Sequence, residues 1–206
     1  MKESKTELIL IRHAQTRWGE GRYCGFSDPP LSSYGRWQVQ RLALHLETTE
    51  VDSIYSSDLK RARQTAEMLS SSRCLEIKTS PSFREQNFGR WDGMTCEEIV
   101  NQDREAYERW LMDIWNYQPP GGENLLQLKK RVCNGVITLI TSHRGKRIVL
   151  VTHGGPVKIL VCTALGLDAA HFWNFRVDQA SVSVIEYYDD TPVVSLLNDT
   201  CHLSEG

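Results

Sequence analysis

Two stretches of the sequence decide the fold: Leu8-Ile9-Leu10-Ile11-Arg12-His13 near the beginning and Ile148-Val149-Leu150-Val151-Thr152-His153 in the second half. Each opens with four apolar residues, rich in β-branched side chains, which is typical of a strand buried on both faces. In an open α/β sheet, ligands bind at the carboxyl ends of the strands. The two histidines are therefore predicted to meet at one ligand site, and Arg12 beside His13 favours a phosphate there.

The composition is that of an ordinary globular domain. Of 206 residues, 40% are hydrophobic and 24% are charged, which is enough for one domain with a sizeable core. The formal net charge is -2 and Lys and Arg do not cluster, so we do not expect a nucleic acid partner. No secretory signal or membrane-crossing stretch is evident, so a membrane is not expected either.

Cysteine usage favours a reducing compartment. Six cysteines are scattered along the chain, and no two form a Cys-x-x-Cys pair. A core of this size does not need disulfides to be stable, so we predict reduced thiols and a cytoplasmic location. The sequence leaves the oligomeric state open, and a homodimer stays among the alternatives.

Strand-like and helix-like segments alternate along most of the chain. The expected strands are 8–11, 52–56, 75–78 (an edge strand), 147–152, 181–188 and 193–197. The expected helices are 35–47, 58–69, 97–115, 123–142 and 155–165. This alternation predicts a three-layer α/β/α sandwich, with a mainly parallel sheet and helices on both faces. We expect one domain over residues 1–206, with a small helical insert at about 92–120.

The residues at the predicted site have the chemistry that phosphoryl transfer needs. A neutral imidazole can attack phosphorus, and guanidinium groups such as those of Arg12 and Arg61 match phosphate geometry. Glu85 is the best-placed carboxylate to give a proton to the leaving oxygen. Taken singly, Arg61 is more often a solvated helix residue and Glu85 a salt-bridge partner.

A metal centre is the alternative use of the same residues. The two histidines with Cys24 and Glu85 could ligate a cation. However, no His-x-x-x-His, His-x-His or Cys-x-x-Cys spacing supports this, and Arg12 would repel a metal ion. We therefore expect no metal and no cofactor, and a small-molecule phosphomonoester as the partner.

Five motifs occur in order over nearly the whole chain: Arg12–Thr16, Gly25–Gly35, Ser57–Ala66, Arg84–Gly93 and Thr152–Gly155. Together they resemble the histidine phosphatase superfamily, in the branch shared by cofactor-dependent phosphoglycerate mutases and small-molecule phosphatases. The resemblance implies a covalent phosphohistidine on His13 and a general acid at Glu85. It also implies that Arg12, Arg61 and His153 hold the phosphate.

Two residues depart from the family pattern. Ala14 replaces the usual glycine and removes some backbone freedom. Gly19 stands where many members carry an asparagine that touches phosphate, so the pocket is expected to lose one hydrogen bond while keeping its charge.

The resemblance also bears on the substrate. The segment between Glu85 and His153 is shorter than in the mutases, which favours access of water and hence a phosphatase. Pro119–Asn124 is similar to a run in alpha-ribazole phosphatases, so alpha-ribazole 5'-phosphate is the favoured substrate. A broad-specificity sugar-phosphate phosphatase, a phosphoglycerate mutase and a non-catalytic phospho-ligand binding protein remain alternatives.

Candidate pocket residues surround this site in the sequence. They are Gly19, Tyr23, Cys24, Gly25 and Trp91. The aromatic residues of the insert are Tyr107, Trp110, Trp115 and Tyr117. These rings, with Trp91, could lie against a flat base. For any single ring, we favour the alternative that it packs the insert onto the domain.

Overall fold

The computed structural model describes residues 5–18, 21–71, 73–189 and 191–204. Within them, one six-stranded sheet has the order β3-β2-β4-β1-β5-β6. The strands are β1 (Thr6–Arg12), β2 (Ser53–Ser57), β3 (Ile77–Ser80), β4 (Arg147–Thr152), β5 (Val182–Tyr188) and β6 (Thr191–Asp199). The first four are parallel, whereas β5 and β6 are antiparallel to their neighbours. The predicted fold class, including the edge position of β3, is confirmed.

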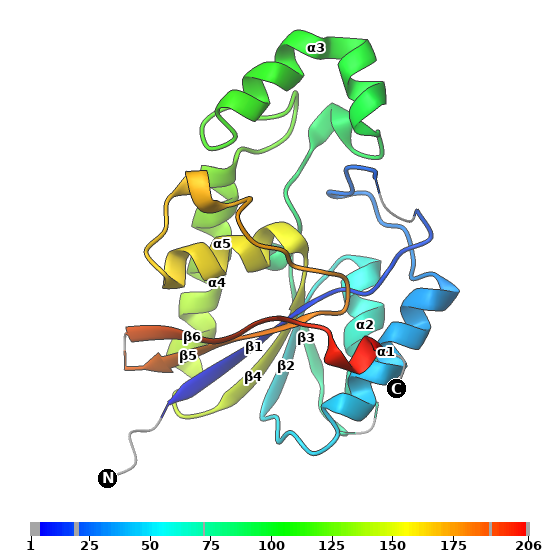
Figure 1. Cartoon of the computed structure of the whole chain (residues 1–206). Coiled ribbons are helices and arrows are strands. Elements are labelled where there is room, and N and C mark those ends of the chain that lie inside the picture. Colours follow the sequence, from blue (N-terminus) through cyan, green and yellow to red (C-terminus); the bar gives the residue numbers. More distant parts are fainter. Residues whose placement is uncertain (1–4, 19–20, 72, 190, 205–206) are drawn as a thin grey trace.

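Helices cover both faces of this sheet (Figure 1). One face carries α1 (Ser33–His45) and α2 (Lys60–Ser70), and the other carries α4 (Leu125–Ser142) and α5 (Gly154–Ala164). A further helix, α3 (Cys96–Met112), stands beyond the carboxyl ends of the parallel strands, at the top of Figure 1. None of the described helices is both long and apolar enough to cross a bilayer.

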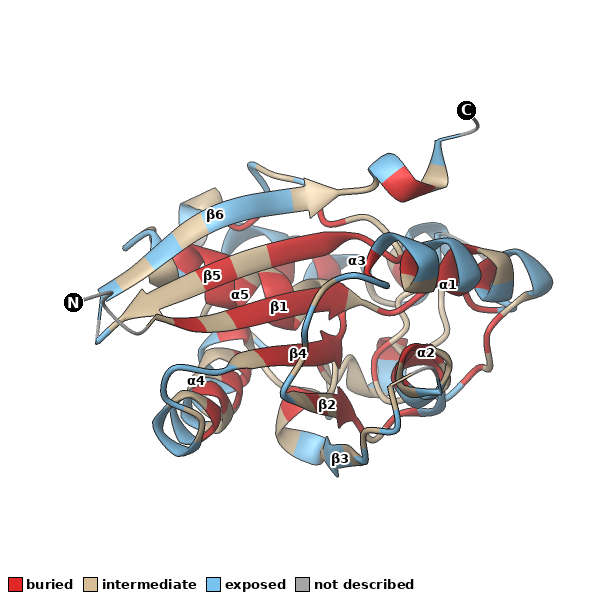
Figure 2. Ribbon diagram, turned by 90° about the horizontal axis from the view of Figure 1, so that it is seen from below, coloured by how far each residue is buried: buried red, intermediate tan, exposed pale blue. Residues whose placement is uncertain are grey.

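The alternation of side chains along the central strands explains why they are apolar throughout. Leu8 and Leu10 of β1 pack with α4 and α5, whereas Ile9 and Ile11 pack with α1 and α2. All four are at most 3% exposed. Figure 2 shows β1 and β4 as the most buried strands, with exposure rising toward β6. The strands that end at the two histidines are thus held from both sides.

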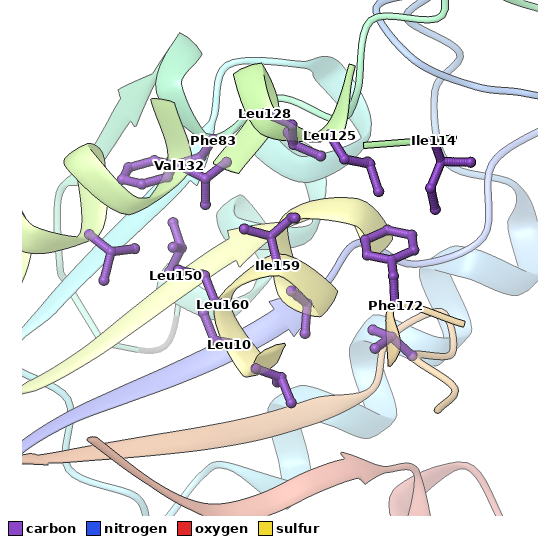
Figure 3. Close-up of a cluster of buried hydrophobic side chains, with 14 of the residues drawn as sticks. Leu10, Phe83, Ile114, Leu125, Leu128, Val132, Leu150, Ile159, Leu160 and Phe172 are labelled. Atoms are coloured by element: carbon purple, nitrogen blue, oxygen red, sulfur yellow. The ribbon is translucent and has the colours of Figure 1, made fainter. Parts of the chain in front are cut away.

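The larger of the two core clusters lies between the sheet and the α4–α5 pair. Figure 3 shows its centre, where Leu10 and Leu150 from the strands meet Val132, Ile159 and Leu160 from the helices. The cluster extends through Leu125, Ile114 and Phe172 toward the carboxyl end of the sheet. One continuous core therefore reaches from the sheet to the base of the insert.

The insert helix is shorter than predicted. It ends at Met112 because Asp113 leaves the helical region, with φ −145°, and Asp113 then accepts a hydrogen bond from the amide of Asn116. The expectation that this helix continues to residue 115 was wrong, since the chain leaves the helix directly after Met112.

Candidate active site

The pairing of β1 with β4 brings the two histidines together. Arg12 lies opposite Thr152 in the parallel register, so the next residue of each strand, His13 and His153, emerges at the same edge. The backbone N–H of His13 donates to the carbonyl of Thr152 at 2.8 Å. The ring centres of the histidines are 5.0 Å apart, and the two side chains are 6% and 0% exposed. The predicted meeting of the two strand ends is thus present in the structure.

Arg61, near the beginning of α2, bridges the two histidines. Its Nε lies 3.2 Å from His13 Nε2 and 3.2 Å from His153 Nδ1. The rest of the guanidinium donates to three backbone carbonyls. Nη1 reaches Ser27 at 2.7 Å, and Nη2 reaches Gly25 at 2.7 Å and Cys24 at 3.2 Å. This fully buried arginine therefore ties loop 24–27 to the histidine pair.

The contacts of the histidines define their protonation. His13 Nδ1 is 2.8 Å from the carbonyl of Ala14, so this nitrogen carries the hydrogen and Nε2 carries the lone pair. His153 accepts from Arg61 at Nδ1, so its Nε2–H donates to Ser57 Oγ at 2.8 Å. Burial, reinforced by the charge of Arg61, holds the pKa of both histidines well below the usual value. His13 therefore has a neutral, nucleophilic Nε2 at neutral pH.

Glu85 is held by the beginning of α5. The amide N–H of Gly155 donates to both carboxylate oxygens at 3.1 Å, and the amide of Gln86 donates to Oε1 at 2.9 Å. A Cβ on Gly155 would lie 2.2 Å from Glu85 Oε1. Only glycine at this position lets the carboxyl group sit against the N-terminus of α5 and accept from its backbone N–H.

Arg131 on α4 clamps the loop that carries Glu85. Its Nη1 donates to the carbonyls of Ser82 and Arg84, and its Nη2 donates to the carbonyl of Glu85 at 2.6 Å. The same guanidinium pairs with Glu123, which accepts from the amide of Asn87 at 2.9 Å. The sequence patterns considered above did not indicate this role. The sequence signal that could have indicated it was an acidic and a basic residue, Glu123 and Arg131, both near the start of the helix predicted over 123–142.

The buried cluster of His13, Arg61 and His153, with Glu85 at its rim, is built from residues of the sequence motifs described above. Residues 8–200 match the family model of the histidine phosphatase superfamily (branch 1). The chain belongs to this family. The predicted resemblance is thereby confirmed.

Two curated relatives of this histidine phosphatase cover nearly its full length. Phosphoserine phosphatase 1 of Hydrogenobacter thermophilus is 37% identical over 97% of this chain and 95% of the relative. The adenosylcobalamin/alpha-ribazole phosphatase of Escherichia coli is 31% identical over 93% of this chain and 95% of the relative. The crystal structure of an alpha-ribazole phosphatase from Shigella flexneri superimposes with a TM-score of 0.87 at 31% identity, covering 94% of this chain and 96% of that one. The protein is therefore a hydrolase acting on phosphate monoesters.

The main cavity of the phosphatase, about 760 Å³, opens beside His13. Of the residues predicted from the sequence, five line it: Arg12, His13, Tyr23, Cys24 and Glu85. Arg61 and His153 lie directly behind, fully buried. This volume is within the usual range for a small-molecule site.

The other predicted residues have different places. Gly25 supplies a carbonyl to Arg61, and its amide donates to Asp92 at 3.0 Å. Trp91 is 3% exposed and packs edge-on against Tyr107 and Trp110. It does not line the main cavity. Its predicted place in the substrate pocket is therefore corrected to a place in the core of the insert. Gly19 lies outside the described residues.

The departure at Ala14 is accommodated without disturbing the site. Ala14 is fully buried in the cluster under α1 and α2, and its amide donates to Thr65 Oγ1 at 3.3 Å. Its carbonyl is the acceptor that orients His13. The added methyl group therefore contributes to packing.

A second, more apolar cavity of about 360 Å³ adjoins the first. The two share Arg12, Tyr23, Glu85, Phe88, Arg176 and Asp178. The walls of the second cavity include a set of aromatic rings: Phe88, Trp110, Phe172, Trp173 and Phe175. Lys158 of α5 also lines this cavity, and its Nζ lies 4.7 Å from the ring centre of Trp173. Of the insert rings, only Trp110 reaches it. The run Phe172-Trp173-Asn174-Phe175 was the sequence signal for this aromatic wall.

The contact between Gly155 and Glu85 generates a first prediction. Gly155→Ala should lower turnover at least tenfold, because the new methyl group displaces the Glu85 carboxylate. Gly154→Ala is the matched control, since its Cβ would be 3.5 Å from Arg12 Nε, an ordinary contact. Steady-state kinetics of the two variants check this. Equal turnover in both would show that the position of Glu85 does not matter.

The protonation of the histidines generates a second prediction. Because their folded-state pKa is depressed, the unfolded chain binds protons below pH ~6.5 that the folded protein does not. The free energy of unfolding should therefore fall with falling pH, by about 1.4 kcal/mol per pH unit for each histidine. Urea unfolding between pH ~6 and ~5 measures this slope. His13→Asn should reduce it by one histidine's share, and an unchanged slope would mean that His13 is protonated when folded.

Proposed function

We propose that this phosphatase hydrolyses its substrate through a phosphohistidine on His13 and that alpha-ribazole 5'-phosphate is its preferred substrate. The observation that carries the first part is that His13 lines the main cavity with its lone pair on Nε2, which lies 3.2 Å from Nε of the buried Arg61. An imidazole fixed in this tautomer needs no further base to attack phosphorus.

The first step forms a bond between His13 Nε2 and phosphorus and breaks the ester bond. Arg12 and Arg61 supply the positive charge that the transferring group requires. His153, with its ring centre 5.0 Å from that of His13, is close enough to contact the same group. Glu85, at the wall shared by both cavities, gives a proton to the leaving oxygen.

The second step returns the enzyme to its starting state. Water attacks the phosphohistidine, and Glu85, now ionised, takes a proton from that water. Inorganic phosphate leaves and Nε2 regains its lone pair. The main cavity is wide enough to hold the attacking water once the alcohol has departed.

The aromatic cavity supports the choice of substrate. Because Glu85 lies between the two cavities, a leaving group protonated by Glu85 extends naturally into the second one. Alpha-ribazole carries a flat, apolar benzimidazole ring, which aromatic walls stabilise by stacking and burial. The relative from Escherichia coli, named as an adenosylcobalamin/alpha-ribazole phosphatase, supports the same choice.

Phosphoserine is the second candidate, because the relative from Hydrogenobacter thermophilus is a phosphoserine phosphatase. Besides Arg12, the cations Lys158 and Arg176 line the second cavity and suit the serine carboxylate. The serine side is small and zwitterionic, however, and gains nothing from the aromatic rings. This difference favours the larger, flat leaving group.

A panel of phosphate esters tests the substrate. It contains alpha-ribazole 5'-phosphate, phosphoserine, several sugar phosphates, and 3-phosphoglycerate with and without a bisphosphorylated primer. We expect the highest kcat/KM for alpha-ribazole 5'-phosphate. A higher value for phosphoserine or for the sugar phosphates would assign that substrate, and primer-dependent isomerisation would indicate a mutase. Absence of turnover on every ester would indicate a binding protein.

A third prediction concerns the covalent step. His13→Ala should abolish turnover while preserving the fold, because no other histidine among the described residues lines the main cavity. Rapid quenching of the wild-type enzyme with labelled substrate, without acid, should leave label on His13. An active alanine variant would contradict the covalent mechanism.

A fourth prediction tests Glu85 through the leaving group. Glu85→Gln should slow alkyl phosphates such as ribosides by roughly 10²–10⁴, the usual contribution of one general acid. It should slow p-nitrophenyl phosphate far less, because nitrophenolate leaves without a proton. Parallel kinetics on both esters measure the difference. Equal losses would mean that Glu85 positions the loop and that the acid is another group, with His153 the next candidate.

A further inference from the structure

We propose that this protein binds one Zn²⁺ ion at its C-terminal turn, through His45, Cys201 and His202. One possible ligand atom from each of these residues lies within 4.8 Å of the others. His45 ends α1, and the other two residues belong to the short turn Cys201–Leu203, which Figure 1 shows beside α1. The site is separate from the histidine pair at the carboxyl ends of the strands.

The spacing of the ligands is close to that of a bound zinc ion. Cys201 Sγ and His45 Nδ1 are 4.0 Å apart. Zinc bonds of about 2.3 Å to sulfur and 2.0–2.1 Å to nitrogen at tetrahedral angles place such atoms roughly 3.5 Å apart. A movement of about half an ångström would therefore bring Cys201 and His45 to the spacing of zinc ligands. The ring of His202 stacks on that of His45 with centres 5.3 Å apart, so it must also turn toward the ion. Arg41 of α1 holds the turn in place by donating to the carbonyl of His202 at 3.1 Å.

His202 is the independent sign that a ligand belongs here. Its side chain is 6% exposed, yet neither ring nitrogen makes a hydrogen bond with a described residue. A buried polar group without a partner destabilises a protein, so such groups normally have one. The carbonyl of Ala180 faces the ring without meeting hydrogen-bond geometry. A metal on the other nitrogen would leave an N–H to strengthen this contact, which is how metal-bound histidines are usually oriented.

Asp199 lies beside both His45 and Cys201. Its Oδ2 is 3.6 Å from His45 Nε2 and accepts a hydrogen bond from the Cys201 thiol at 3.3 Å. Zinc binding would replace the proton of this thiol. The resulting thiolate and the Asp199 carboxylate would together balance the charge of the ion.

The donor set selects the metal. One thiolate and two imidazoles suit Zn²⁺ and are poor ligands for Mg²⁺ or Ca²⁺, which prefer oxygen. His45 and Cys201 are both exposed, so water can complete the coordination. The neighbours Thr200, Leu203 and Ser204 line the main cavity, so the ion would fix one wall of the active site without entering the reaction.

Zinc binding by the purified full-length protein tests this proposal. The apoprotein is titrated with Zn²⁺ against a chromogenic chelator, and with Co²⁺ to observe thiolate-to-metal charge transfer. We expect one equivalent of each metal and a higher Tm with Zn²⁺. His45→Ala and Cys201→Ser should weaken Zn²⁺ binding by more than the 10–100-fold cost of losing an outer-shell partner.

Matched controls separate this site from other exposed side chains. His171→Ala and Cys74→Ser remove an exposed histidine and an exposed cysteine elsewhere, and both should keep wild-type affinity. Both altered ligands are at the surface, so the variants should fold, and circular dichroism verifies this. Unchanged affinity in the double variant His45→Ala/Cys201→Ser, or a Co²⁺ complex without a thiolate band, would overturn the proposal.

Discussion

The guanidinium of Arg61 is the interaction on which the site depends. It is fully buried, and no carboxylate among the described residues pairs with it. Its charge is met only by three carbonyls and two imidazole lone pairs. Burying a cation without a counter-ion costs on the order of several kcal/mol. A phosphate dianion bound beside His13 would supply the missing negative charge. The unliganded site is therefore already organised electrostatically to favour an anion.

The same arginine explains why the two histidines stay neutral and oriented. Burial is the main cause of the depressed pKa of both rings, and Arg61 adds to it, because a protonated imidazole would be a second buried cation beside the guanidinium. Both rings therefore accept from Nε, and each uses its remaining N–H elsewhere, His13 toward Ala14 and His153 toward Ser57. One side chain thus sets the charge, the tautomer and the direction of two others.

The parts of the fold predicted from sequence were those decided locally. Runs of four apolar residues define buried strands, and a histidine two residues after such a run lies at the carboxyl end of the strand. Trp91 and Asp113 show where this reasoning stops. Periodicity identified a helix face but could not show that Asp113 ends the helix early, or that Trp91 faces the insert core and not the ligand. The aromatic cavity also escaped prediction, because Trp110 and Phe172 meet only through tertiary packing.

The run Pro119–Asn124 acquires a different meaning in the structure. A Cβ on Gly122 would lie 2.3 Å from the carbonyl of Asn87, and one on Gly89 would lie 2.2 Å from that of Pro120. These glycines let two loop backbones touch, and Glu123 then joins the clamp on the loop of Glu85. The run Pro119–Asn124 therefore helps to hold the Glu85 carboxylate in place. Its similarity to alpha-ribazole phosphatases says little about recognition of the benzimidazole ring of the substrate. The weight of the substrate assignment rests on the aromatic cavity.

Under the proposed function, the site has a phosphate end, where the reaction takes place, and a leaving-group end, which selects the substrate. The phosphate end is built from strand ends and helix beginnings that two core clusters hold rigid. The leaving-group end is built from α3, the segment around Phe172–Phe175 and one lysine of α5. Substitutions in the second region change the shape and charge of the cavity without touching His13, Arg61 or Glu85. One relative named as a phosphoserine phosphatase and another named as an alpha-ribazole phosphatase both match nearly the whole chain. A common phosphate end with different leaving-group ends would account for both names.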